Sequence, residues 1–306
     1  MDLFLFQLHE WAAILVKVAH IIAGIAWIGA SFYFVWLENS LQKVDEAKQE
    51  KGVAGELWAL HGGGFYEVQK YALAPPEMPE KLHWFKWEAY ATWASGMLLM
   101  LLVYYAQAQG HLASGESWVQ DPAHGVLWSL SLLAIGVIVY ECMTRYLHRF
   151  SRPFLACILG WISLLCWACF ESFSDRAAII HVGAILGTFM VGNVFFSIIP
   201  AQRQFVDAIE AGAELPVMAI AEARMRSRLN NYLTLPVVIC MLAGHIAHFF
   251  SDQLSWLALL LLMATAAYTR HFFNLRNQGA IRPHILVVSA VGYVGLLVAM
   301  HAGVFV

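Results

Sequence analysis

Long apolar runs separated by short polar segments dominate the sequence. A helix rises about 1.5 Å per residue, so about 20 apolar residues cross a hydrocarbon core of about 30 Å. Each run is long enough to do so. The sequence therefore predicts an all-α polytopic membrane protein with eight transmembrane helices, near residues 11–37, 87–106, 125–147, 153–173, 177–199, 232–250, 254–271 and 284–305.

Basic residues in the connecting segments predict the orientation. Sixteen of the eighteen Lys and Arg residues lie in the first, third, fifth and seventh loops, and the alternate loops hold only Arg176. Cytoplasmic loops retain an excess of Lys and Arg. We therefore expect both termini outside, in the periplasm, in a bacterial inner membrane. Two of the cytoplasmic loops, 38–86 and 200–231, are long and contain helix-compatible stretches that Gly and Pro interrupt.

A weak internal repeat relates the two halves of the chain. The first and fifth predicted helices share one His, two Gly and one Phe at similar spacing: His20, Gly24, Gly29 and Phe34, then His181, Gly187, Gly192 and Phe195. An even number of helices per half gives a parallel repeat about an axis along the membrane normal. We expect a single transmembrane domain over residues 1–306 with a 4+4 internal repeat, its halves at about 1–174 and 175–306.

Proline positions predict continuous helices rather than the broken helices of many transporters. Pro200 lies at a predicted helix end, and four other prolines lie at predicted helix starts: Pro122, Pro153, Pro236 and Pro283.

The amino-acid composition is that of a protein embedded in a membrane. Sixty per cent of the residues are hydrophobic and 13% are charged, whereas a soluble domain carries about 25% charged residues. The net charge of −3 is small, so no nucleic-acid partner is expected. The lipid bilayer is the expected surrounding, and the sequence leaves a homo-oligomer open.

Some polar and sulfur-containing residues have a structural explanation. Glu141 can pair with Arg145 one helical turn later. Cys166 and Cys169 have C-x-x-C spacing, but Phe170 follows where covalent haem attachment needs His. We expect packing from these cysteines.

Histidines inside the apolar runs are candidate haem ligands. His20 lies near the middle of its predicted helix, and four others fall in the outer halves of theirs: His181, His245, His248 and His301. Imidazoles from facing helices can hold a buried haem iron, so haem b is expected, with His20 and His181 as one possible pair. His245 and His248 share a helical face, and His248 is the second choice. The alternative is that each His only hydrogen-bonds a neighbouring helix.

A second set of polar and aromatic residues gathers on the cytoplasmic side. Aromatic rings offer stacking faces, while Lys, Glu and Asn offer charge and hydrogen bonds, so a planar polar heterocycle suits them. The alternative is an ordinary aromatic belt at the headgroups. The set is Glu67, Lys70, Lys86, Trp87, Glu88, Tyr90, Asn230, Asn231 and Tyr232.

Five stretches carry a family resemblance. They resemble the bacterial membrane-bound urate oxidases, also called urate hydroxylases, and the resemblance spans nearly the whole chain: 20–33 (HIIAGIAWIGASFY), 61–75 (HGGGFYEVQKYALAP), 83–90 (HWFKWEAY), 193–202 (NVFFSIIPAQ) and 230–236 (NNYLTLP). The resemblance implies oxidation of urate to 5-hydroxyisourate with cytochrome c, rather than oxygen, as the electron acceptor.

Many members of that family carry a fused C-terminal cytochrome c domain. This chain ends at Val306 without a C-x-x-C-H motif, so we expect no cytochrome c domain in it. A piece of a longer protein, a version with a separate cytochrome and a relative with altered chemistry all stay open.

The resemblance identifies the expected planar ligand as urate, bound between the halves on their cytoplasmic side. Lys70 or Lys86 would balance its charge, and Glu67 or Glu88 would act as the base. Electrons would then pass through intramembrane haem to cytochrome c on the outer side. Two alternatives remain: a purine permease without a redox centre, and a b-type membrane cytochrome that oxidises quinol or another small donor.

Overall fold

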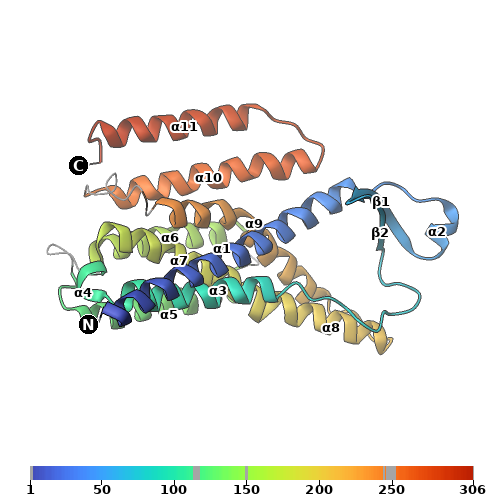
Figure 1. Cartoon of the computed structure of the whole chain (residues 1–306). Coiled ribbons are helices and arrows are strands. Elements are labelled where there is room, and N and C mark those ends of the chain that lie inside the picture. Colours follow the sequence, from blue (N-terminus) through green and yellow to red (C-terminus); the bar gives the residue numbers. More distant parts are fainter. Residues whose placement is uncertain (1–2, 113–117, 149–150, 244, 246–252, 306) are drawn as a thin grey trace.

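The structure is a computed structural model that describes residues 3–112, 118–148, 151–243, 245 and 253–305. Its helices run side by side in one bundle, and a β-hairpin projects from one end (Figure 1). Both ends of the chain lie at the other end of the bundle. This shared location is what two termini on one side of a membrane require. Which side they face stays a prediction.

Six helical segments in the described part of the chain are long and apolar enough to cross a membrane. The fourth is a continuous run, made of α7 (Asp175–Asn193), the π-helical turn η2 (Val194–Ile198) and α8 (Ile199–Glu210). The others are α1 (Leu3–Ser40), α5 (Pro122–Tyr146), α6 (Ser151–Ser172), α10 (Ser255–Asn277) and α11 (His284–His301).

The other two predicted spans coincide with helices of a different character. α3 (Trp87–Leu99) continues into the π-helical turn η1 (Met100–Tyr105), and α9 (Val217–Ala243) begins with a polar, Arg-containing half. Short helices α2 (Glu46–Glu50) and α4 (Ala108–His111) complete the set in the described residues. The count of eight spans and the 4+4 repeat therefore stay predictions.

Two prolines lie inside helices, so the prediction that they mark helix ends is wrong. Pro236 lies within α9, and the helix that contains Pro200 continues to Glu210. Proline removes one backbone N–H from the helical ladder. At Pro200 the wider turns of η2 come directly before it, and such π-bulges are a known way to accommodate an interrupted ladder.

The segment 38–86 contains a β-hairpin where the sequence suggested only helix-compatible stretches. Strand β1 (Val53–His61) pairs antiparallel with β2 (Gly64–Tyr71). Gly62 and Gly63 both have positive φ, 59° and 80°, which a two-residue hairpin turn requires. Val53, Gly55 and Leu57 are buried and alternate with more exposed residues, as the inner face of a strand requires.

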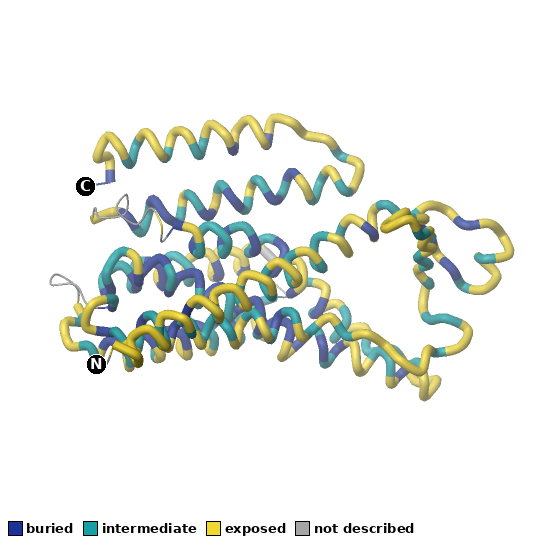
Figure 2. Tube along the Cα trace, in the orientation of Figure 1, coloured by how far each residue is buried: buried dark blue, intermediate teal, exposed yellow. Residues whose placement is uncertain are grey.

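Burial separates an inner helix from two outer ones. α7 is buried along most of its length, whereas α1 and α11 expose apolar side chains almost throughout (Figure 2). Extended apolar surfaces of this kind mark membrane contact. The chain is therefore a mostly helical, membrane-associated protein.

Candidate functional site

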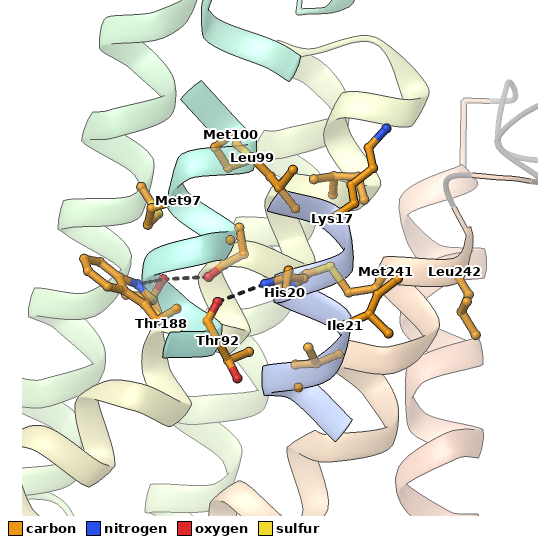
Figure 3. Close-up of a pocket in the computed structure, with 18 of the residues that line it drawn as sticks. Lys17, His20, Ile21, Thr92, Met97, Leu99, Met100, Thr188, Met241 and Leu242 are labelled. Carbon is orange, nitrogen blue, oxygen red and sulfur yellow. Dashed lines mark hydrogen bonds between the residues drawn. The ribbon is translucent and has the colours of Figure 1, made fainter. Parts of the chain in front are cut away.

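A mostly apolar cavity of about 410 Å³ lies between α1, α3, α7 and α9. Four glycines border it, which lets the helices and any occupant approach closely: Gly24, Gly96, Gly183 and Gly187. Two histidines and two basic side chains also line it: His20, His245, Lys17 and Arg176. Figure 3 shows His20 directed between α3 and α9, toward Thr92 on one side and Met241 on the other.

His20 is held in one orientation by α3. Its Nδ1 lies 2.9 Å from the carbonyl oxygen of Thr92 and 3.1 Å from the hydroxyl of Ser95. Donation from Nδ1 to the carbonyl leaves Nε2 as the acceptor. The ring also packs so closely on Gly96 that a Cβ there would lie 3.0 Å from its Cε1. A histidine that binds iron through one nitrogen commonly donates the other N–H to a backbone carbonyl in this way.

Among the described residues, the structure brings one other predicted haem ligand to this cavity. His245, just beyond α9, lines it together with His20. His301 lies at the exposed end of α11. His248 lies outside the described residues.

His181 has a different environment, in which both ring nitrogens have partners. Its Nδ1 lies 2.6 Å from the carbonyl oxygen of Ala177, and its Nε2 lies 2.6 Å from the hydroxyl of Ser129. The ring stacks on Phe173 with centroids 4.3 Å apart. This arrangement is that of a packed, hydrogen-bonded histidine.

The residues around the cavity fit a haem. The porphyrin supplies the equatorial ligands, so the protein needs only axial ones, and His20 and His245 are available. Apolar walls and glycines suit the flat macrocycle. Lys17 and Arg176 could pair with its propionates, and both also border a smaller cavity of about 170 Å³ next to it.

Four predicted substrate residues lie together at the start of α3. The Lys86 ammonium is 5.2 Å from the centre of the Trp87 ring, and Tyr90 meets Trp87 edge to face at 5.9 Å. Glu88 places one carboxylate oxygen 3.8 Å from Nε2 of His83. Its other oxygen, Oε2, is buried and has no hydrogen-bond partner within the described part of the chain.

Glu67 and Lys70 lie apart from this group, on strand β2. Lys48 donates to Glu67 at 2.6 Å and also pairs with Glu56. The hydrogen bond from Lys48 lowers the pKa of the Glu67 carboxyl to about 2. Lys70 pairs with Glu38. Both predicted residues are therefore engaged in exposed ion pairs.

Asn230 belongs to a buried network built around Arg226. The guanidinium of Arg226 contacts both oxygens of Glu141, at 2.5 and 3.0 Å, and Glu222 at 2.7 Å. The predicted Glu141 and Arg145 pair is present at 2.8 Å. We call the buried network the Arg226 cluster: Tyr140, Glu141, Asn193, Glu222, Arg226 and Asn230.

Amide groups complete this cluster. Asn193 Nδ2 donates to the Tyr140 hydroxyl at 2.7 Å and to Asn230 Oδ1 at 2.8 Å. Asn230 in turn donates to the carbonyl oxygen of Met190 at 2.9 Å. Asn230 thus has partners within the protein for both its donor and its acceptor.

Asn231, the next residue, belongs to a separate cluster. Its Oδ1 accepts from Arg270 Nε at 3.1 Å and from Asn274 Nδ2 at 2.7 Å. The Arg270 guanidinium lies over the Phe32 ring, 3.6 Å from its centre. We call Phe32, Asn231, Arg270 and Asn274 the Arg270 cluster. Tyr232 instead hydrogen-bonds His271, with the hydroxyl 2.8 Å from Nδ1.

Sequence reasoning missed Arg226 and Arg270 because both were counted as loop charges. A signal for Arg270 was present, since it lies inside the predicted span 254–271. An ionisable residue within a span is a candidate functional residue.

The fold and the cavity define a helical membrane protein with a large apolar site inside its bundle. The sequence matches the family described as urate oxidase N-terminal over residues 6–301, and the chain belongs to that family. No curated protein and no solved structure matches it. Membership confirms the resemblance and links the chain to urate oxidation, as an enzyme of the oxidoreductase type that acts on urate.

Proposed function

We propose that the chain oxidises urate to 5-hydroxyisourate and that cytochrome c accepts the electrons on the outer side of a bacterial inner membrane. Family membership is the observation that carries this proposal. The urate monoanion and one water give 5-hydroxyisourate, one proton and two electrons. The water oxygen forms the new C5–O bond, and two molecules of cytochrome c each take one electron.

A haem b held by His20 and His245 would supply one-electron transfer inside the bundle. The contacts of His20 support its part in this proposal. Thr92 and Ser95 fix the ring through Nδ1, and Nε2 is left for the iron. His181 is less suited, because both of its nitrogens are already hydrogen-bonded.

Glu88 is the better placed of the two candidate bases. A base must hold a carboxylate oxygen ready for the substrate proton. Glu88 has a buried oxygen without a partner, whereas hydrogen bonding to Lys48 lowers the pKa of Glu67 to about 2 and makes Glu67 a weak base. Trp87 and Tyr90 lie beside Glu88 and could stack on a planar ring.

The decisive experiment follows urate under anaerobic conditions with purified protein and oxidised cytochrome c. Ultraviolet loss of urate, with two cytochromes reduced per urate, is the expected result. No urate loss would reject the proposal. Transport of unaltered urate into vesicles by a colourless protein would favour a permease, and a haem that only quinol reduces would favour a b-type cytochrome.

The absorption spectrum of the purified protein tests the haem assignment separately. We expect a Soret band that is lost or shifted in His20→Ala. The matched variant His301→Ala, on the exposed end of α11, should keep the band. An unchanged band in both variants would contradict the assignment of His20 as a ligand.

A further inference from the structure

Arg270 is a buried cation without an anion. Its exposed fraction is 4%, and no carboxylate lies within ion-pair distance of it in the part of the chain that the structure describes. A charge taken out of water is costly unless an opposite charge and hydrogen bonds compensate for it. The Phe32 ring covers one face of the guanidinium but supplies no negative charge.

Three polar atoms of the Arg270 cluster are also buried without a hydrogen-bond partner among the residues that the structure describes. They are Nη2 of Arg270, Nδ2 of Asn231 and Oδ1 of Asn274. Buried polar atoms almost always have partners, so several unpartnered atoms on touching side chains point to a role in binding rather than in packing. They come from two helices, α9 and α10, and Phe32 comes from a third, α1.

The hydrogen bonds fix which of these atoms donates. Arginine has only donors, so Asn231 must turn its oxygen toward Arg270. That oxygen also faces Asn274, which must therefore present its NH₂ group there and leave its own oxygen free. The three unpartnered atoms are therefore two donors, the cationic Arg270 Nη2 and Asn231 Nδ2, and one acceptor, Asn274 Oδ1.

We infer that the Arg270 cluster is a binding site for a planar anion that has a carbonyl or ring-nitrogen acceptor next to an N–H donor. An anionic acceptor on the ligand meets Arg270 and Asn231, and its N–H donates to Asn274. The identity of the ligand rests on the proposed function, and the inference makes the Arg270 cluster, rather than the pair of Trp87 and Tyr90, the group that holds the urate ring. The urate monoanion has this charge and this alternation of C=O and N–H along its edge.

Three probes separate charge from hydrogen-bonding pattern. Urate has both, inorganic phosphate has the charge without the ring edge, and hypoxanthine has the ring edge without the charge. Equilibrium dialysis against purified full-length protein, without cytochrome c, should show urate bound at least about tenfold more tightly than either. Equal binding of phosphate and urate would overturn the planar-ring assignment.

Substitutions test the residues. Arg270→Gln should weaken urate binding at least about thirtyfold, the lower range for removing one partner of a buried charge pair. Arg276→Gln is the matched control, because Arg276 is an exposed arginine on the same helix. It should bind urate as the unmodified protein does.

Asn274→Asp tests the site by charge rather than by deletion of the arginine. The new carboxylate has the shape of the amide, removes the N–H that donates to Asn231 Oδ1 and adds a negative charge beside the bound anion. We expect loss of urate binding, and a cooperative thermal unfolding transition in each variant shows that the protein is folded. Full urate affinity in both Arg270→Gln and Asn274→Asp would overturn the inference.

The same measurements separate this site from the proposed activity. Urate binding that depends on Arg270, without anaerobic reduction of cytochrome c, would leave the site standing and reject the oxidation. Urate oxidation by Arg270→Gln with an unchanged KM would leave the oxidation standing and reject the Arg270 cluster as the urate site.

Discussion

The Arg226 and Arg270 clusters are built from the same residue types but differ in completeness. Each has a buried arginine, with exposed fractions of 1% and 4%, and each includes one of two consecutive asparagines on α9. Neighbours on a helix point about 100° apart. Asn230 therefore meets α7, and Asn231 meets α10.

Whether a buried arginine finds all its partners inside the protein distinguishes a structural polar cluster from a candidate binding site in this bundle. Arg226 has two carboxylates and one amide oxygen as partners, so the protein itself compensates its charge. Arg270 has one amide oxygen and an aromatic face. The Arg226 cluster therefore holds helices together. In the described residues, the Arg270 cluster leaves a positive charge without a carboxylate and three polar atoms without partners, which a ligand could satisfy.

Loss of each arginine should therefore have opposite consequences for stability. Arg226→Gln leaves Glu141 and Glu222 without their buried partner, and we expect a loss of about 3–5 kcal/mol in the free energy of unfolding. Arg270→Gln removes an uncompensated charge, so the free energy of unfolding should stay the same or rise. Titration with SDS in mixed micelles, without urate, measures both.

Arg145→Gln is the control for this pair, because Arg145 contacts the same Glu141 from an exposed position. Its loss should cost less than about 1 kcal/mol. Equal losses for Arg226→Gln and Arg270→Gln would show that the two clusters do not differ as described.

Amide substitutions should repeat the contrast at a smaller scale. Asn193→Leu removes a fully buried side chain that donates to Tyr140 and to Asn230, and it should cost about 1–3 kcal/mol. Asn274→Leu deletes an oxygen that has no partner among the described residues and one N–H that donates to Asn231, whose oxygen keeps its bond from Arg270. The same titration should show a loss of about 0.5–1.5 kcal/mol, the usual net contribution of one hydrogen bond. A larger loss for Asn274→Leu than for Asn193→Leu would contradict the comparison.

Local patterns in the sequence predicted the local parts of this structure. Apolar runs located the helices because lipid demands long apolar segments with internally satisfied backbones. The pair of Glu141 and Arg145 followed from one-turn spacing. The same spacing argument could not find Arg226 as a second partner of Glu141, since the two residues are 85 positions apart.

The remaining errors also have physical causes. Segment 38–86 was interpreted as helix-compatible stretches that Gly and Pro interrupt, although Gly62 and Gly63, both at positive φ, form the turn of a hairpin. Asn230 and Asn231 were assigned to one ligand site, although consecutive helix residues point in different directions. The environments of both asparagines depend on which distant helices pack against α9, and local sequence patterns do not predict that packing.

The exposed ion pairs of Lys48 on the hairpin are a third case to set beside the two arginine clusters. Their loss should have the smallest effect on stability. Hydrogen bonding from Lys48 lowers the pKa of Glu67 to about 2, from an unfolded value near 4.5. A lowered carboxyl pKa stabilises the folded state above the unfolded pKa, and this contribution is lost as the pH falls from about 4.5 toward 2.

Glu67→Gln should therefore flatten the dependence of the unfolding temperature on pH over that interval, and Lys48→Gln should do the same. Water screens this pair, so neither variant should approach the loss expected for Arg226→Gln at neutral pH. A pH dependence that persists unchanged in both variants would assign it to other carboxylates.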